Sequence, residues 1–189
     1  MKALLTASAL CAATLMAACS TDPDLYVAPK PEAVQAVRIS YASVAVQEVS
    51  LPTYAASQDI SVADASGKIS PASDSLWADE GTRAVTLSLA QGLSDATNAR
   101  VAPAPWPFLN RPDVTVDVRF ESFVADATGQ FTLRGMYFIA PEDAGRADRS
   151  RSFEITEAYD AAAGIPAIAA ARSAALAKLA QDIATRGLR

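Results

Sequence analysis

The feature that most constrains the fold is a strict alternation of apolar and polar residues in the middle of the chain. Across residues 113–121, polar or charged residues alternate with four apolar ones: Val114, Val116, Val118 and Phe120. Successive side chains of a strand point to opposite faces, so this pattern predicts a strand with one buried and one wet face. The same period returns in residues 130–140 after a turn at 125–129, and residues 151–159 supply a third strand. Together they predict an antiparallel meander.

Two helices are predicted around this meander. Residues 78–97 place Val85, Leu89 and Leu93 at fourfold spacing, with acidic residues near the N-terminal end, where the helix dipole favours them. Near the C-terminus, five apolar residues have spacings of 3, 8, 3 and 4, which fit one helical stripe: Ile165, Ile168, Leu176, Leu179 and Ile183. Alanine fills most of the other positions, so this helix can pack close to a sheet.

Further strands are predicted before the first helix. Residues 36–49 are β-branched and partly alternating, and they end at Leu51-Pro52, which predicts a strand followed by a turn. Residues 58–73 predict two short strands around a hairpin turn at 65–67. The order is strands, helix, three strands, helix. It predicts a single α+β domain whose mainly antiparallel sheet carries both helices on one face.

The first 18 residues have the pattern of a secretory signal peptide. Lys2 is followed by an uncharged run to Ala18, which is shorter than the roughly 20 apolar residues of a spanning helix and is rich in alanine and threonine. Cys19 follows two alanines, and this arrangement resembles a bacterial lipobox, in which the cysteine is acylated and becomes the first residue of the mature chain. The alternative is an ordinary signal peptide with an incidental cysteine.

This interpretation divides the chain into three parts. Residues 1–18 are the lipoprotein signal peptide, and residues 19–36 are the lipidated N-terminus and a tether rich in proline, alanine and charge, with room for one short strand. The 18 steps from Cys19 to Val37 reach about 60 Å when fully extended. Residues 37–189 are then long enough for one periplasmic domain with its own core.

Composition excludes several kinds of chemistry. The sequence has no histidine, which excludes Ser-His-Asp and Cys-His catalysis and histidine-ligated zinc. Cys11 lies in the signal peptide and Cys19 would be acylated, so neither remains for a disulfide or a thiol site. Removing residues 1–18 leaves 15 basic and 21 acidic residues, a formal charge of −6 that does not favour nucleic acid. We expect no catalysis, no cofactor and no metal.

Large aromatic residues in or beside proline-containing loops are the candidate contact residues: Tyr54, Trp77, Trp106 and Phe108. They have two interpretations. They can anchor loops onto the core, or they can form a surface for a partner or a lipid, because tryptophan and tyrosine bring large rigid area to interfaces. A groove that holds lipid is a third possibility, and it requires a continuous apolar cavity.

Several motifs recur in the order and spacing of a known family. They are Cys19, Leu51-Pro52-x-Tyr54, Trp77-Ala78, Pro105-Trp106-Pro107, Arg111-Pro112-Asp113, a strand ending at Phe120, and residues 173–184. In these motifs the chain resembles the PqiC-type (YmbA-like) ABC-type transport auxiliary lipoproteins of intermembrane lipid transport systems, over nearly the whole mature sequence. The chain departs from the family pattern at residues 55–57, and at Gly81, where a proline is common.

The resemblance implies a non-enzymatic lipoprotein on the periplasmic face of the outer membrane. It implies an auxiliary role in a phospholipid transport system, docking the tunnel of an MCE-domain protein that works with a membrane permease component. Ser20 follows the acylated cysteine in place of the aspartate typical of inner-membrane retention, which favours sorting to the outer membrane. A tunnel built as a ring suggests that the docking lipoprotein also forms a homo-oligomeric ring. The alternative is a carrier that holds phospholipid in its own pocket.

Overall fold

The long strand β6 (Val114–Asp126) organises the sheet. Its alternating apolar residues are buried, as the sequence predicts. On one edge β6 pairs with β7 (Gln130–Pro141), which in turn pairs with β8 (Arg149–Ala158), and both pairings are antiparallel. The predicted meander is therefore confirmed. The computed structural model describes residues 22–31 and 35–189, so Cys19 and Ser20 lie outside the described residues.

The other edge of β6 is shared by two groups of strands. Its beginning pairs in parallel with β2 (Ser43–Val46), which also pairs in parallel with β5 (Arg100–Pro103). Its end pairs in parallel with β3 (Asp59–Ala63). The predicted hairpin joins β3 to β4 (Ile69–Trp77), and the short strand β1 (Asp24–Tyr26) pairs in parallel with β4. The result is an eight-stranded mixed sheet.

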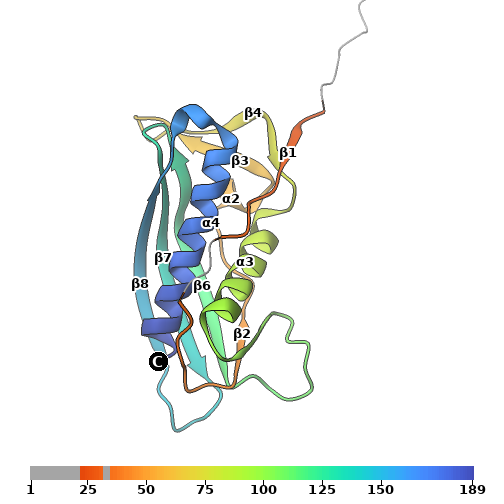
Figure 1. Cartoon of the computed structure of the whole chain (residues 1–189), viewed down its shortest axis with the longest axis vertical. Coiled ribbons are helices and arrows are strands. Elements are labelled where there is room, and N and C mark those ends of the chain that lie inside the picture. Colours follow the sequence, from red (N-terminus) through yellow and green to blue (C-terminus); the bar gives the residue numbers. More distant parts are fainter. Residues whose placement is uncertain (1–21, 32–34) are drawn as a thin grey trace, which may run out of the picture.

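Two long helices cover one face of this sheet (Figure 1). Helix α3 (Gly81–Ala96) packs against β2 and β5, and α4 (Ile165–Asp182) packs against β7, β8 and α3. A π-helical turn, η3 (Ile183–Gly187), extends α4, and two short helices, α2 (Thr53–Ala56) and η2 (Ala161–Ala163), lie in loops. The single α+β domain with two helices on one sheet face is confirmed.

The core lies between the sheet and the helices. Phenylalanines from three strands form a continuous row of edge-to-face contacts there, with ring centroids 5.3 to 5.5 Å apart: Phe120, Phe123, Phe131 and Phe153. Such contacts add to the burial of apolar area, so this row is a main source of cohesion between β6, β7 and β8.

The first predicted strand is much shorter than its pattern suggests. Only Ser43–Val46 pairs as a continuous strand, whereas residues 36–49 were expected to do so. The reason is that side chains satisfy the backbone just before it. The Asp113 carboxylate accepts hydrogen bonds from the N–H groups of Ala42 and Ser43, at 2.6 and 3.0 Å. Ile39 N–H donates to Asn98 Oδ1 at 2.8 Å.

Helix α3 begins at Gly81, three residues after the predicted start. A Cβ atom at Gly81 would overlap the carbonyl oxygen of Ala55 in α2. A proline also carries a Cβ, so it does not fit at this position while α2 lies where it does. This contact explains why the chain departs here from the pattern of the family it resembles.

Candidate functional site

The four candidate aromatic residues form two separate pairs. Tyr54 and Trp77 line one narrow crevice against the core, together with Phe123 and Ile168. Trp106 and Phe108 contact each other in the loop between β5 and β6. The structure therefore divides the four candidates into one inward-facing pair and one outward-facing pair.

Trp77, at the end of β4, is 7% exposed and packs against a buried cation. The guanidinium carbon of Arg172 in α4 lies 4.4 Å from the Trp77 ring centroid and 5.5 Å from that of Phe123. Arg172 is 3% exposed, and its Nε has no hydrogen-bond partner among the described residues. Burial lowers the pKa of Arg172 to about 10, against the opposing effect of the Asp79 carboxylate, so the side chain stays charged at neutral pH.

Tyr54, in α2, is half-buried and ties this helix to the sheet. Its hydroxyl accepts a hydrogen bond from Phe123 N–H at 3.3 Å, and its carbonyl accepts one from Ser61 Oγ at 2.9 Å. These contacts join α2 to β6 and β3. They correspond to the loop-anchoring interpretation of this residue.

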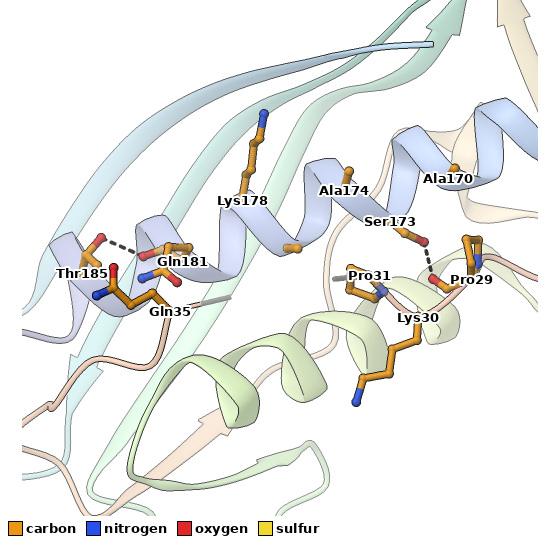
Figure 2. Close-up of a pocket in the computed structure, with 11 residues that line it drawn as sticks. Pro29, Lys30, Pro31, Gln35, Ala170, Ser173, Ala174, Lys178, Gln181 and Thr185 are labelled. Carbon is orange, nitrogen blue, oxygen red and sulfur yellow. Dashed lines mark hydrogen bonds between the residues drawn. The ribbon is translucent and has the colours of Figure 1, made fainter. Parts of the chain in front are cut away.

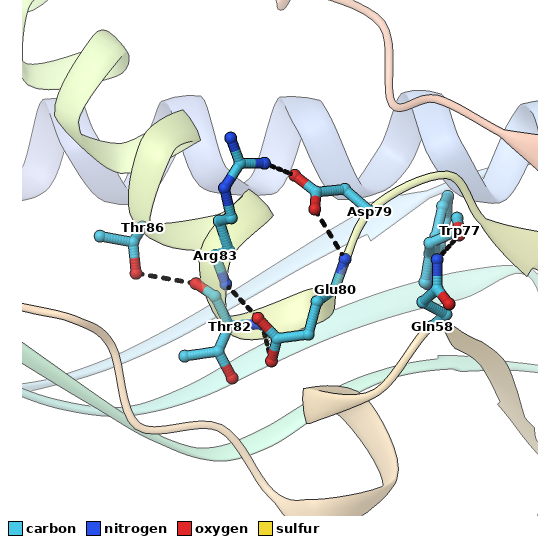
Figure 3. Close-up of polar contacts among 7 residues, drawn as sticks. All are labelled: Gln58, Trp77, Asp79, Glu80, Thr82, Arg83 and Thr86. Atoms are coloured by element: carbon cyan, nitrogen blue, oxygen red, sulfur yellow. Dashed lines mark hydrogen bonds and ion pairs between the residues drawn. The ribbon is translucent and has the colours of Figure 1, made fainter.

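The acidic pair before α3 has a structural role (Figure 3). The Glu80 carboxylate accepts hydrogen bonds from the N–H groups of Thr82 and Arg83, at 3.3 and 3.0 Å, and so caps the helix. Asp79 forms an ion pair with the Arg83 side chain. Close by, Gln58 Nε2 donates to the Trp77 carbonyl at 3.2 Å. The acidic residues that the sequence places at the start of this helix thus stabilise it, Glu80 as the cap and Asp79 through its ion pair.

The loop between β5 and β6 is braced from within and open to solvent outside. Trp106 and Phe108 make an edge-to-face contact with centroids 4.9 Å apart, and Trp106 Nε1 donates to the Asn110 carbonyl at 2.7 Å. The Arg100 guanidinium lies 5.0 Å from the Phe108 centroid. Phe108 is nevertheless 42% exposed, and Leu109 is fully exposed. We call residues 104–113 the aromatic loop.

A hollow of about 740 Å³ runs beside the aromatic loop. Its walls combine the exposed aromatic and apolar side chains with two cations, Arg100 and Arg111, and one acid, Asp113. Asp113 is already held by backbone N–H groups, and Arg111 pairs with Glu142 at 3.6 Å while remaining exposed. The surface thus mixes exposed apolar side chains with polar ones and two arginines, which suits a partner segment that offers both apolar and acidic side chains.

A second cavity, of about 760 Å³, lies along α4 (Figure 2). Alanines of α4 form much of its floor, Lys30 and Lys178 stand at its rim, and residues 29–31 and Gln35 close one side. Ser173 Oγ donates to the Pro29 carbonyl at 2.7 Å and fixes that side to the helix. Residues 32–34, between the two flanking segments, lie outside the described residues.

Sequence reasoning missed three features of these surfaces. Arg172 is hidden in an alanine-rich helix, and a single arginine there reads as a solvent-facing residue. Leu109 follows the quoted aromatic residues but belongs to no motif. The docking of residues 24–30 onto the domain has no local signature, because β1 contains only 3 residues.

Comparison of the sequence with models of known protein families shows the family of this chain. A family model described as ABC-type transport auxiliary lipoprotein component matches residues 24–184, which is most of the chain. The chain belongs to this family. It is therefore an auxiliary component of ABC-type transport, rather than a member of an enzyme family, and the family is one of membrane-anchored lipoproteins. In the part of the chain that the structure describes, no helix has the length and apolar character to cross a bilayer.

Solved structures support the fold. Protein XCC0632 from Xanthomonas campestris, a DUF330 protein, has a TM-score of 0.67 at 18% identity, over 87% of this chain and 95% of that one. An uncharacterised protein has a TM-score of 0.64 at 16% identity, over 87% of this chain and 97% of that one. A PelC dodecamer from Paraburkholderia phytofirmans matches at a TM-score of 0.43 and 13% identity, over 82% of this chain and 93% of that one. A comparison with curated proteins finds no match.

Proposed function

We propose that this protein is a PqiC-type lipoprotein, anchored through acylated Cys19 to the periplasmic face of the outer membrane, where it docks the tunnel of an MCE-type phospholipid transport system. The protein contributes no chemistry of its own in this role. It holds the end of the tunnel at the membrane, beside the MCE-domain protein and its permease component. Several copies would surround a ring-shaped tunnel as a ring.

The observation that carries the docking role is the aromatic loop. It presents Phe108 and Leu109 to solvent on a base held rigid by Trp106 and Arg100. Tryptophan and arginine are enriched among interface hot spots, and phenylalanine is enriched in interfaces generally. By contrast, Trp77 is almost fully covered and Tyr54 is half-buried, so they offer little contact area. We assign the partner contact to Trp106, Phe108 and Leu109, and the support beneath it to the core.

Co-purification of the tagged full-length protein with an MCE-domain partner in mild detergent tests this function. Leu109→Asp places a charge on a side chain that is fully exposed, and should reduce recovery of the partner at least tenfold, the lower range of a hot-spot loss of about 2 kcal/mol. Leu87→Asp is the matched control, because Leu87 is 41% exposed on α3, away from the aromatic loop. Recovery of the wild-type protein alone, from cells that contain the partner, would contradict the proposal.

The second candidate function is a phospholipid carrier, and the cavity along α4 favours it. Its volume of about 760 Å³ falls in the range of small-molecule sites, and its floor is alanine. The two lysines beside it are each paired with a carboxylate, Lys30 with Asp95 and Lys178 with Glu157, so a lipid phosphate would have to compete with these carboxylates. Native mass spectrometry of the soluble domain distinguishes the two functions. Stoichiometric bound phospholipid, lost in Ala174→Trp, would favour the carrier, and a lipid-free domain would favour docking.

A further inference from the structure

Residues 24–30 lie on the folded domain rather than apart from it. β1 pairs with the end of β4, with Leu25 opposite Leu76, and the Tyr26 carbonyl accepts a hydrogen bond from Ala78 N–H at 2.8 Å. The Pro29 carbonyl is held by Ser173, and Lys30 pairs with Asp95 of α3 at 3.5 Å. The segment therefore crosses from the sheet to both helices and is fixed at each.

This docking shortens the distance between the domain and its N-terminal anchor. If the chain were free up to Val37, Cys19 could stand about 60 Å away. With β1 docked, only five steps separate Cys19 from Asp24, and these span at most about 18 Å. An acyl chain on Cys19 lies in the hydrocarbon of the bilayer, beneath a headgroup layer about 5–7 Å thick. The start of β1 must then lie at or just above the membrane surface.

Two apolar side chains are exposed at this place. Leu25 is 62% exposed and Val27 is 77% exposed. Residues two apart in an extended segment project to the same side, so the two form one apolar spot on the outside of the edge strand. Tyr26, between them, faces inward and packs against the core. Water is a poor environment for this pair, whereas the headgroup boundary of a bilayer accepts such side chains.

We propose that residues 24–27 form a membrane seat, in which Leu25 and Val27 contact the phospholipid surface and hold the domain at a fixed distance and orientation. The proposal rests on the proposed acylation of Cys19, which brings the seat to the bilayer. The ligand is the bilayer surface itself, and zwitterionic lipid suits it, because the mature chain has a formal charge of −6. The acyl chains supply attachment, and the seat supplies orientation.

The seat also fixes the direction of the aromatic loop. In Figure 1, β1 enters near one end of the long axis, and the loop between β5 and β6 lies at the other end. The pairings agree, because β5 and β2 flank the beginning of β6, whereas β3, which carries β4 and β1, flanks its end. With β1 on the membrane, the aromatic loop lies at the end of the domain that is away from the membrane.

Fluorescence of the acylated full-length protein in phosphatidylcholine vesicles tests the seat. The sequence has only Cys11, in the signal peptide, and Cys19, so Leu25→Cys introduces the only free thiol of the mature acylated chain. An environment-sensitive dye at position 25 should shift to the blue in vesicles and be quenched by lipids with nitroxide headgroups. The matched control, Leu109→Cys, should keep an aqueous spectrum and be quenched severalfold less, because Leu109 is equally apolar but lies at the far end.

The other possible results distinguish a failure of the anchor from a failure of the seat. If metabolic labelling with a palmitate analogue does not label the protein, or if a second dye molecule attaches to Cys19, the acyl anchor is absent. Either result would overturn both the anchor and the seat. A protein that carries the label but gives an aqueous spectrum at position 25 would overturn the seat and leave the anchor standing. Shielding of position 25 that depends on protein concentration and occurs equally in detergent would identify a second copy as the occupant and would also overturn the seat.

Discussion

Arg172 is a cation held almost entirely by aromatic faces. Its guanidinium lies over Trp77 and near Phe123, and no ion pair between described residues includes it. A desolvated cation–π contact with tryptophan contributes about 2 kcal/mol, while burying a charge without a counterion costs several kcal/mol. The Arg172 side chain therefore stabilises the fold mainly through the volume that it fills. Its positive charge leaves the free energy of unfolding almost unchanged or lowers it.

We expect the two substitutions at Arg172 to differ. Arg172→Met keeps most of the volume and removes the buried charge, so its free energy of unfolding should equal or exceed that of the wild type. Arg172→Ala leaves a cavity beneath Trp77 and should lower the free energy of unfolding by about 2–4 kcal/mol. Urea unfolding of a soluble version that begins at Thr21 measures both. Equal losses in the two variants would mean that the charge itself holds the site.

Asp126, in the turn between β6 and β7, gives a pH-dependent prediction. Burial raises the pKa of its carboxyl, but hydrogen bonds from Thr128, Gln130 and Gly129 outweigh this effect and hold the pKa below its usual value of 3.8. A carboxyl with a lowered pKa in the folded state stabilises the fold above the unfolded pKa and loses that effect as pH falls through the folded pKa. Asp126→Asn should therefore reduce the loss of stability below about pH 4, measured by the melting temperature of the variant and the wild type across this pH range.

Residue by residue, the sequence identifies the aromatic candidates but not their exposure. Tyr54, Trp77, Trp106 and Phe108 all lie in or near loops with proline and are equivalent by sequence pattern. Trp77 is covered because Arg172 of α4, about a hundred residues later, packs over it. Phe108 stays exposed because nothing in the described part of the chain covers its loop. Long-range packing decides the difference, and no local pattern records it.

At the scale of elements, α3 and α4 meet through small residues. A Cβ atom at Gly92 would lie 2.9 Å from the Cβ of Ala180, closer than side-chain carbons approach each other. Gly92→Ala gains about 1 kcal/mol of helix propensity, which offsets part of the resulting strain. Gly92→Leu gains nearly as much helix propensity, but its larger side chain must separate the two helices, so it should lower the free energy of unfolding by about 1–3 kcal/mol.

The matched control is Ser94→Leu, two residues later and exposed on the opposite side of α3. It adds the same side chain to the same helix without touching α4, so its free energy of unfolding should stay within about 0.5 kcal/mol of the wild-type value. Denaturant unfolding of the two variants side by side checks the contact. Similar values for both would show that the helices do not pack through Gly92.

Helices and strands whose apolar residues recur with a clear period were predictable from the sequence. The pairing of strands far apart in the chain was not. The alternation in β6 and β7 and the apolar stripe of α3 are local properties, so these elements were found to within a few residues, although β6 runs further than expected. The pairing of β2 with β5 and β6 joins residues more than fifty positions apart, such as Val44 with Val101 and Val114. Such parallel pairs leave no signature in a short window, so the sequence predicted a mainly antiparallel sheet without the parallel pairings.

At the scale of the whole molecule, we expect the proposed anchor at Cys19 to be separable from the fold. Cys19 lies outside the matched domain of residues 24–184, and no described contact involves a cysteine. Cys19→Ser should therefore lose metabolic labelling with a palmitate analogue while the domain folds as before. Circular dichroism and melting temperature of the soluble version beginning at Thr21 should match those of the delipidated wild type. Label retained in Cys19→Ser, or absent from the wild type, would overturn the lipoprotein assignment for this cysteine.

The whole molecule is then a rod with two functional ends. The segment that we propose as the membrane seat, residues 24–27, lies near one end, and the aromatic loop lies at the other (Figure 1). The helices and the phenylalanine core connect these ends, which suits the proposed role of positioning a partner.

Photocrosslinking in living cells tests the central claim, that the aromatic loop docks a transport partner. A photoreactive amino acid at position 109 should give a light-dependent product that contains an MCE-domain protein, while the same residue at position 88 on α3 should give none. Leu109 is fully exposed and Ser88 is exposed as well, so neither replacement disturbs the core. Products from position 109 that contain only further copies of this chain, or no product in cells that express the transport system, would contradict the docking role.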